Sequence, residues 1–358
     1  MSSKKWLTGY LILLVALLIG VLLMVVLIDP FFHYHKPLDG LFYTLDNERS
    51  QNDGMLKHFD YDAVSTGTSL TANTKISEVD DLYDVDAIKA QFSGGSYYEI
   101  NRNLETAFDH QKIGTVIRCL DMAYLLDDKD LLRIDMGEYP DYLYDDNLWN
   151  DTKYIFNRDV VFQRCIPMLL EAAAGRKGGI TSFDDYGYWM DGVTFGADAV
   201  LGGYYPFFDP PYSPGLTEEE AENVRENVRQ NLTAIAAAHP ETTFYYYFSP
   251  VSAAWWGLTK TSGDFFRTTD AERIAVEEML PYDNIRLFLF SDKTDITTDL
   301  ANYKDALHYG DWINSDILHW MKEGDGALTK ENWEERLAKE QEFYLNYDYN
   351  QLFDQMEH

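Results

Sequence analysis

Three side chains in this sequence are of the types needed for nucleophilic catalysis. Ser69 follows the glycine of the stretch AVSTGTSLTAN, and Asp305 and His308 lie three residues apart in KDALHYGDW near the other end of the chain. A serine hydroxyl is a weak nucleophile until a base takes its proton. An imidazole does this well when a carboxylate holds its second ring nitrogen. We therefore predict that Ser69 is the nucleophile, His308 the base and Asp305 the residue that orients the base.

Two glycines and two charged residues lie where other strands are expected to end. The stretch SGGS contains Gly94 and Gly95. A glycine lets a bare backbone N–H approach the oxyanion that forms when a hydroxyl attacks an ester, so either is a candidate for this contact. The stretch RCLD contains Arg118 and Asp121, which are candidates for binding a substrate, and Asp121 is also a candidate for holding a loop.

The aromatic run YYYFSPVSAAWW predicts a strand that is followed by the rim of a site. Tyr245 and Tyr247 belong to the apolar part of this run and are expected in the core. Trp255 and Trp256 lie beyond Pro250, which ends the strand because proline cannot donate a ladder hydrogen bond. We therefore expect both tryptophans at the edge of a carbohydrate-binding surface.

Strands and helices alternate along most of the chain. Apolar and β-branched stretches predict five strands, at 61–69, 86–96, 113–125, 242–250 and 284–291. Helical spacing predicts helices at 97–111, 218–239, 270–280 and 310–324. This alternation is typical of an α/β protein, a three-layer α/β/α sandwich with a central parallel sheet of about five strands.

The same pattern predicts how the candidate residues come together. In an open parallel sheet, ligands bind outside the carboxyl ends of the strands. Ser69, the two glycines and Asp121 each follow a different predicted strand, and the last predicted strand leads to Asp305 and His308. We therefore expect these residues to converge at one edge of the sheet.

Residues 127–216 interrupt the alternation. They are rich in Asp, Tyr, Gly and Pro, as in DYLYDDNLWND and FDDYGYWMDG. Long aromatic loops of this kind are usually functional, so we predict an insertion that covers the strand ends and shapes the site for an acyl acceptor. The predicted division of the chain is an anchor at 1–28, a connector at 29–59, the α/β domain with its insertion at 60–325, and a peripheral C-terminal helix and tail at 326–358.

The order of these stretches resembles the SGNH/GDSL hydrolase superfamily. AVSTGTSLTAN is similar to its first block, a strand, a Gly-x-Ser turn and a helix, and DALHY to its last block, Asp-x-x-His. SGGS stands where the family carries its oxyanion glycine. The match covers roughly residues 60–320, interrupted by the insertion. It implies a flavodoxin-like fold, a Ser69–His308–Asp305 triad, and an oxyanion hole formed by the backbone N–H groups of Ser69 and of Gly94 or Gly95.

The sequence also departs from that family. GTS stands at 67–69 where the family commonly has Gly-Asp-Ser. The third block usually has the form Gly-x-Asn-Asp, but here Arg118 and Leu120 replace the glycine and the asparagine, so the usual side-chain oxyanion donor is missing. An α/β-hydrolase elbow would need Gly-x-Ser-x-Gly, and Thr71 stands in its last place.

The resemblance extends to membrane-anchored acyltransferases of cell-surface polymers, of the teichoic acid D-alanyl transfer and alginate O-acetylation types. It implies acyl transfer or ester hydrolysis on a cell-envelope polysaccharide or teichoic acid, through an acyl-enzyme at Ser69 and without a cofactor. An acyl donor supplied by a membrane-bound O-acyltransferase is expected from the same relatives. The missing asparagine leaves a second hypothesis open, a catalytically inactive binding or assembly protein at the cell surface.

The N-terminal segment predicts a membrane anchor. No residue from 7 to 28 is charged, and at about 1.5 Å per residue this stretch spans a hydrocarbon core of roughly 30 Å. Large residues continue up to Asp29, unlike a signal peptide with a small-residue cleavage site. Lys4 and Lys5 precede the span, so the positive-inside rule predicts a cytoplasmic N-terminus and an extracytoplasmic remainder.

Charge and cysteine content limit the partners. The formal net charge of −31 argues against a nucleic-acid partner, which requires basic surface, and against peripheral docking on anionic lipid. The chain has two cysteines, Cys119 and Cys165. They form either a disulfide or two buried free thiols, and the sequence leaves both alternatives open.

Overall fold

The computed structural model describes residues 3–137, 139–145, 147–203, 206–208, 210 and 214–356. The chain forms two compact units. Unit 1 consists of Met1–Asp60 and Glu138–Ser182, and unit 2 of Tyr61–Gly137 and Phe183–His358. The predicted insertion is therefore divided, because its middle part folds with the N-terminal segment and its two ends fold with the sheet.

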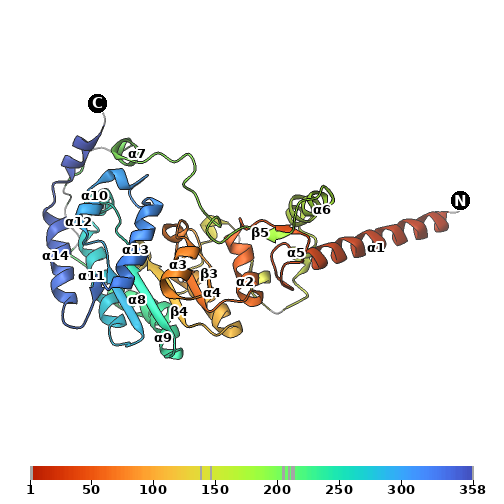
Figure 1. The fold of residues 1–358 in the computed structure, drawn as a ribbon, viewed down its shortest axis with the longest axis horizontal. Helices are drawn as coiled ribbons and strands as arrows, with labels where there is room; N and C mark the ends of the chain where they lie inside the picture. The colour runs from red at the N-terminus through yellow and green to blue at the C-terminus, as the bar shows by residue number, and fades with distance from the viewer. Residues whose placement is uncertain are drawn as a thin grey trace. The chain divides into compact units, whose positions relative to one another are not determined.

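Unit 1 begins with α1 (Ser3–Ile28), drawn in red in Figure 1. Among the described residues, it is the one helix long and apolar enough to cross a membrane. Its side chains are exposed from residue 3 to residue 20, whereas Val25 and Ile28 at its end are buried. A helix that is apolar on every side and uncovered by protein has the composition of a membrane span or of a signal sequence.

The rest of unit 1 brings two distant segments together. Parallel strands β1 (Phe42–Tyr43) and β5 (Gly179–Ile180) pair. The helical elements are α2 (Glu48–His58), α5 (Thr152–Ile155), the π-helical turn η5 (Val160–Cys165) and α6 (Ile166–Ala173), which continues η5. The predicted connector thus contains a helix, α2, that its polar sequence does not indicate.

Unit 2 is built on a mostly parallel six-stranded sheet. Its strands are β2 (Ala63–Thr66), β3 (Ala87–Lys89), β4 (Thr115–Leu120), β6 (Thr243–Phe248), β7 (Ile285–Leu289) and β8 (Ala327–Leu328). They lie in the order β3-β2-β4-β6-β7-β8, and only β8 is antiparallel to its neighbour. The α/β class and the mostly parallel central sheet are confirmed, and the sheet has six strands where about five were predicted, because β8 adds an antiparallel edge strand.

Helices cover both faces of this sheet. The longer ones are α3 (Ile76–Tyr83), α4 (Tyr97–His110), α8 (Glu218–Val228), α10 (Ala253–Ser262), α11 (Phe265–Met279), α13 (Asp311–Glu323) and α14 (Trp333–Asn346). Two neighbouring residues of β6 show the two faces, because successive side chains of a strand point in opposite directions. Tyr245 packs against Tyr83 of α3, whereas the Tyr246 hydroxyl donates to the Leu232 carbonyl after α8, 3.2 Å away.

The C-terminal helix is part of this packing rather than a peripheral addition. Tyr344 of α14 is fully buried, and its ring stacks on Trp256 of α10 with centroids 4.6 Å apart. Leu337 on the same helix is also buried. The predicted boundary at 326 therefore does not separate α14 from the core of unit 2.

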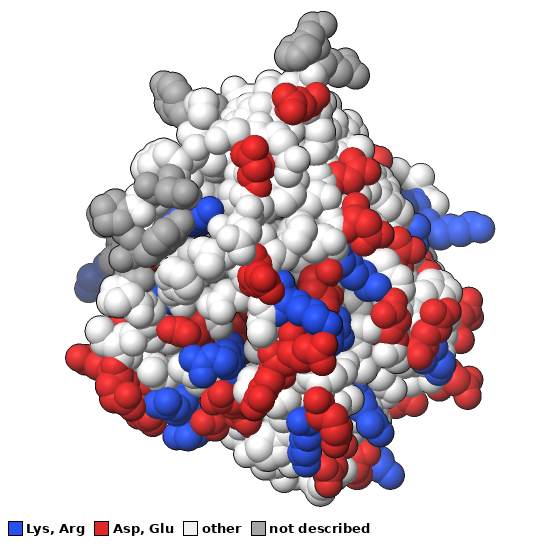
Figure 2. All heavy atoms as spheres, turned by 90° about the vertical axis from the view of Figure 1, so that its left-hand side faces the viewer, with Lys and Arg blue, Asp and Glu red and all other residues white. Residues whose placement is uncertain are grey.

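The acidic surface carries many basic side chains as well. Figure 2, which faces the side where α14 lies in Figure 1, shows Asp and Glu spread widely with Lys and Arg among them, and no continuous basic area on that face. Several pairs lie within ion-pair distance, such as Arg229 with Glu278 at 2.8 Å. Exposed pairs of this kind contribute at most about 1 kcal/mol each, so they govern solubility more than stability.

Candidate active site

A tight turn after β2 presents Ser69. Gly67 has φ +150, and a Cβ there would lie 2.6 Å from Cγ2 of Thr71, so only glycine is accommodated. Ser69 then begins the short 3-10 helix η1 (Ser69–Thr71). Asn314 of α13 donates its side-chain N–H to the Leu70 carbonyl at 2.9 Å. The backbone around the predicted nucleophile is therefore held by both the turn and a neighbouring helix.

The predicted base lies in a loop that is held at two points. An antiparallel bridge between Tyr303 and Tyr309 closes the loop around His308. The Ser252 hydroxyl, just after β6, donates to the Ala306 carbonyl at 2.7 Å. These contacts hold the loop against the end of β6, at the same edge of the sheet as the turn after β2.

The structure brings the three predicted catalytic residues together. Ser69 Oγ lies 2.8 Å from His308 Nε2. His308 Nδ1 lies 2.9 Å from both carboxylate oxygens of Asp305. The side chain of His308 is 21% exposed and that of Asp305 is 45% exposed, so solvent and small molecules reach this line of groups.

The charge of Asp305 defines the roles of the two ring nitrogens. Burial alone would raise the pKa of the Asp305 carboxyl, but hydrogen bonds from the His308 ring and backbone and from the Leu307 N–H lower the pKa to about 2. The carboxylate is therefore ionised at neutral pH and accepts the Nδ1 proton. Nε2 is then left with its lone pair facing the Ser69 hydroxyl, which is the arrangement that proton removal requires.

The glycine pair forms a turn in which only one glycine keeps a free donor. Gly94 has φ +66 and occupies the third position of a turn closed by a hydrogen bond from Gly95 N–H to the Phe92 carbonyl at 2.7 Å. Gly95 is thus unsuited as an oxyanion donor, and of the two predicted alternatives Gly94 remains. Among the described residues, neither the Gly94 N–H nor the Ser69 N–H has an acceptor. These two remain the candidate oxyanion donors.

Arg133 supports the Gly94 turn, a role that no sequence motif indicates. Its guanidinium donates to the Gly94 carbonyl at 2.9 Å and to the Tyr124 hydroxyl at 3.2 Å. Two further N–H groups hold the Asp135 carboxylate, each at 2.9 Å. The N-terminal end of the predicted insertion therefore fixes the turn that carries the candidate oxyanion donor.

Asp121 is buried beside the site rather than open to a substrate. It is 6% exposed, its carboxylate accepts the Ala123 N–H at 3.1 Å, and the Thr68 hydroxyl lies 3.5 Å away. Burial raises the pKa of the Asp121 carboxyl, and hydrogen bonds from the Ala123 N–H and the Thr68 hydroxyl oppose this. These contacts agree with the loop-holding alternative, because Asp121 links the end of β4 to the residue before Ser69.

Arg118 is not at the substrate side of the sheet, which corrects its assignment as a substrate-binding residue. Its side chain is fully buried and donates to the Asn231 carbonyl at 2.8 Å and to the Tyr97 carbonyl at 3.3 Å. The guanidinium also lies 5.4 Å from the centre of the Tyr97 ring. Arg118 therefore ties α4 to the helical segment after α8 beneath the sheet.

The two tryptophans of α10 also differ from the prediction. Trp256 is fully buried between Tyr344 and Phe265, so it belongs to the core and not to a rim. Trp255 is half-buried and packs edge-on against Trp256, with ring centroids 5.0 Å apart. Of the pair, only Trp255 retains exposed surface for a ligand.

Trp189 is a site residue that the motif search missed. Its indole N–H donates to the Ser69 carbonyl at 3.4 Å, and its ring meets the His308 ring edge-to-face at 5.6 Å. Its backbone N–H is held by the Asn73 side chain at 3.1 Å. On the other side, Lys304 Nζ lies 3.8 Å from the centre of the indole. The only sequence signal was its place in the aromatic stretch FDDYGYWMDG of the predicted insertion.

These contacts join Asp305, His308, Ser69, Trp189 and Lys304 into one cluster of side chains. It has a hydroxyl, a base with an ionised partner, and the backbone N–H of Ser69 without an acceptor among the described residues. No family model matches the chain, and neither a curated protein nor a solved structure matches it. A function for unit 2 therefore has to be inferred from the arrangement of Ser69, His308 and Asp305.

Proposed function

We propose that the protein is a membrane-anchored serine acyltransferase or esterase that acts on ester-linked acyl groups of a cell-envelope polysaccharide or teichoic acid. The observation that carries this proposal is the continuous hydrogen-bonded line from Ser69 Oγ through His308 to the ionised Asp305, at 2.8 and 2.9 Å. Distances of about 2.6–3.2 Å are those of a nucleophile and its general base.

The first half of the reaction forms an acyl-enzyme. Ser69 Oγ attacks the carbonyl carbon of the donor ester while its proton moves to His308 Nε2, and Asp305 stabilises the imidazolium that results. The N–H groups of Ser69 and Gly94 donate to the oxyanion of the tetrahedral intermediate. When the intermediate collapses, the C–O bond of the donor breaks, the leaving alkoxide takes the proton from His308, and the acyl group remains on Ser69.

The second half transfers the acyl group. A water molecule or a sugar hydroxyl gives its proton to His308 and attacks the acyl carbon, and the released Ser69 oxygen recovers the proton. Trp189 and Lys304 lie beside His308 and are suited to hold this acceptor, the indole by stacking on a sugar ring and the ammonium by pairing with phosphate or carboxylate groups of the polymer. The reaction needs no cofactor.

The strand order supports a relationship with the SGNH fold. The parallel strands follow the order β3-β2-β4-β6-β7, which corresponds to 2-1-3-4-5 when they are counted along the chain. This is the order of flavodoxin-like sheets, whose ligands bind where the order reverses. Here the reversal lies beside β2, and Ser69 follows that strand directly.

The apolar helix supports a location at the cell membrane. We propose that α1 is an uncleaved single-pass anchor with its N-terminus in the cytoplasm and unit 2 outside. A membrane-bound O-acyltransferase that presents an acyl donor is then the expected partner. A protease added to intact cells should degrade unit 2, and complete protection of unit 2 would contradict this orientation.

A second candidate function is a binding or assembly protein that has the fold without the chemistry. Two observations favour it. The Gly95 N–H already donates to the Phe92 carbonyl within its turn, and β4 ends with Leu120, which has no side-chain donor for an oxyanion. An oxyanion hole with one donor too few costs about 100- to 1000-fold in rate. A sufficiently slow centre would leave binding as the only useful activity.

Covalent labelling separates the two candidates. The full-length protein in detergent micelles is treated with a fluorophosphonate probe, and the labelled peptide is identified by mass spectrometry. The acyltransferase proposal expects label on Ser69, none in Ser69→Ala, and unchanged labelling in the control Ser262→Ala, whose hydroxyl lies at the exposed end of α10. Absence of label on folded wild-type protein, with heat-denatured protein as the background, would favour the binding protein.

A further inference from the structure

The helix formed by η5 and α6 in unit 1 carries both buried and exposed apolar side chains. Val161, Cys165 and Met168 are buried against the rest of the unit. Phe162, Leu169 and Leu170 are exposed by 64%, 44% and 65%. Residues 162, 169 and 170 are spaced by seven and eight positions, which places them along one side of the helix. This side is therefore an apolar stripe that the described part of unit 1 does not cover.

Further exposed apolar residues come from the segment just before η5. Phe156 is 45% exposed, Leu148 is 71% exposed and Trp149 is 90% exposed. Tryptophan is enriched at membrane–water interfaces, because its ring is apolar while its N–H finds polar partners. We name the exposed side chains of Trp149, Phe156, Phe162, Leu169 and Leu170 the collar surface.

Four of the five collar residues, all but Trp149, lie in a basic segment of an acidic chain. Residues 152–177 contain five Lys or Arg and two Asp or Glu, a net charge of +3, whereas the whole chain carries −31. Arg158 and Lys177 in this segment are exposed. The segment thus combines apolar stripes with positive charge, which is the composition that suits an interface with anionic lipid headgroups.

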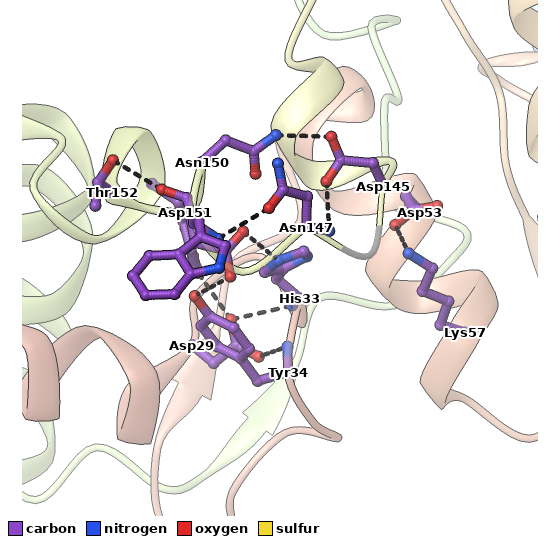
Figure 3. Close-up of polar contacts among 12 residues, drawn as sticks. Asp29, His33, Tyr34, Asp53, Lys57, Asp145, Asn147, Asn150, Asp151 and Thr152 are labelled. Carbon is purple, nitrogen blue, oxygen red and sulfur yellow. Dashed lines mark hydrogen bonds and ion pairs between the residues drawn. The ribbon is translucent and has the colours of Figure 1, made fainter.

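The outer end of α1 is fixed to the same segment. The Asp29 carboxylate, directly after α1, accepts the Tyr154 hydroxyl at 2.8 Å and the backbone N–H groups of Tyr34 at 2.6 Å and of His33 and His35, each at 3.0 Å. Figure 3 shows Asp29 facing the Asp151 region of the chain. The Tyr154 hydroxyl therefore joins the end of the apolar helix to α5, which precedes η5, while the three backbone N–H groups hold the turn that follows α1.

A second set of contacts strengthens this joint. Asp151 accepts the Tyr34 hydroxyl at 2.9 Å, and His33 Nε2 lies 3.3 Å from the same carboxylate (Figure 3). The η5 turn also packs directly on α1. The collar surface thus cannot move far from the point at which α1 would leave a bilayer.

We propose that the collar surface inserts into the interface of the bilayer that α1 crosses, with Arg158 and Lys177 beside the lipid phosphates. The proposal rests on the anchor part of the proposed function and is independent of the catalytic part. A lipid surface is favoured over a protein partner by the continuity with α1 and by the local positive charge. Insertion would make unit 1 a rigid collar at the membrane surface.

The experiment places a fluorescent probe on the collar surface of the full-length protein in vesicles. Cys119 and Cys165 are buried free thiols, so an added surface cysteine is labelled selectively. An environment-sensitive probe is attached to Leu170→Cys, and quenching is measured with lipids that carry a nitroxide just below the headgroup. Leu17→Cys in α1 tests the anchor with a deeper nitroxide, and Glu331→Cys in unit 2 is the control that should not be quenched.

The proposal expects quenching of the probe at Leu170→Cys together with quenching at Leu17→Cys. If Leu17→Cys is quenched and Leu170→Cys is not, the collar proposal is overturned while the anchor stands. If neither probe is quenched, the anchor proposal and the collar proposal are both wrong. If the probe at Leu170→Cys is shielded from both lipid nitroxides and aqueous iodide, a protein covers the surface and the proposal is again wrong.

A second experiment tests whether the positive charges of Arg158 and Lys177 contribute to lipid binding. Adding phosphatidylglycerol to phosphatidylcholine vesicles should increase quenching at Leu170→Cys by about twofold, because the basic residues are drawn to anionic headgroups. Arg158→Gln together with Lys177→Gln should abolish this increase. The circular dichroism spectrum should be unchanged in the same variant, which shows that the fold is kept by a measurement that does not depend on the catalytic proposal. An equal increase in the variant would contradict the role of these two residues.

Discussion

Ser69 Oγ and His308 Nε2 lie 2.8 Å apart although 239 residues separate them in the chain. The contact exists because β2 and the loop held against β6 both end at the carboxyl edge of the sheet. Nothing in the packing of the core requires it, since both side chains are partly exposed. This polar contact, with an ionised carboxylate behind the imidazole, is the observation on which the proposed chemistry rests.

The first prediction concerns this pair as a unit. Ser69→Ala and His308→Ala should each lower turnover of p-nitrophenyl acetate by more than about 1000-fold, and the double variant should be no worse than either. The reason is that a serine without its base is already nearly inert. Steady-state rates of the three variants check this, with circular dichroism to show that the fold is kept. Losses that multiply in the double variant would contradict a shared role.

The second prediction concerns Asp305 and pH. Its pKa is lowered to about 2, so the carboxylate stays charged across pH 4–9. The stability that it gains from its hydrogen bonds is complete above its ordinary value of 3.8 and is lost only as the pH falls through about 2. Asp305→Asn should therefore reduce the rate by a similar factor, on the order of 100- to 10 000-fold, at every pH from 6 to 9. A pH–rate profile of both proteins measures this, and a loss that disappears at one end of the range would contradict it.

The third prediction concerns the indole of Trp189. Trp189→Phe removes the N–H that donates to the Ser69 carbonyl but keeps a ring beside His308, so the rate should fall by about 2- to 10-fold, the usual effect of one hydrogen bond. Trp189→Ala should also raise KM for a polymer acceptor, because the stacking surface is lost. Separate measurement of kcat and KM checks this. Equal behaviour of the two variants would show that the ring does not contact the acceptor.

The fourth prediction concerns Lys304. Its ammonium lies over the Trp189 ring, next to Asp305 in the chain. Lys304→Gln should raise KM for a polyanionic acceptor such as a teichoic acid several-fold, and added salt should diminish the difference because it screens the charge. Turnover of neutral p-nitrophenyl acetate should be almost unchanged. A similar change for both substrates would indicate a structural role.

Much of unit 2 was predictable, because its signals are local. Each parallel strand is a short apolar run between turn residues, and the strand ends alone brought Ser69 and His308 to one edge. Trp189 was not identifiable, since its segment has no periodicity to fix its position. Arg118 was expected to bind a substrate because it stands near the end of a predicted strand, but its partners are the carbonyls of Tyr97 and Asn231 in distant segments. Only the folded chain shows that pairing.

The division into two units could not be predicted from the sequence for a similar reason. Unit 1 is assembled from the N-terminal 60 residues and a segment that begins at residue 138. Its two segments are held together by side-chain contacts such as the hydrogen bond from Tyr154 to Asp29, and local sequence patterns do not predict such contacts. Helix α2 was missed because its buried face is polar, with Gln51 and Asn52 fully buried.

The last prediction concerns a pair of buried carboxyl groups that join α11 and α14. Glu272 and Glu340 are 1% and 2% exposed. Burial raises the pKa of Glu340 to about 7, with a contribution from Asp292 that Arg336 opposes. Burial and the neighbouring Glu340 also raise the pKa of Glu272 well above its usual value. The pair therefore retains a proton at a pH where the unfolded chain has already lost it.

The direction in which pH changes the folding stability follows from this bound proton. The folded protein binds more protons than the unfolded chain between the ordinary value of 4.5 and about 7, so the stability contributed by Glu340 is complete below 4.5 and is lost as the pH rises through 7. Glu340→Gln provides a neutral donor at every pH. It should raise the unfolding temperature by a few degrees at pH 8 and much less at pH 5. Thermal unfolding at both pH values measures this, with Glu335→Gln on the exposed side of α14 as the control. Equal shifts in the two variants, or a wild-type unfolding temperature that does not fall between pH 5 and 8, would show that the pair shares no proton.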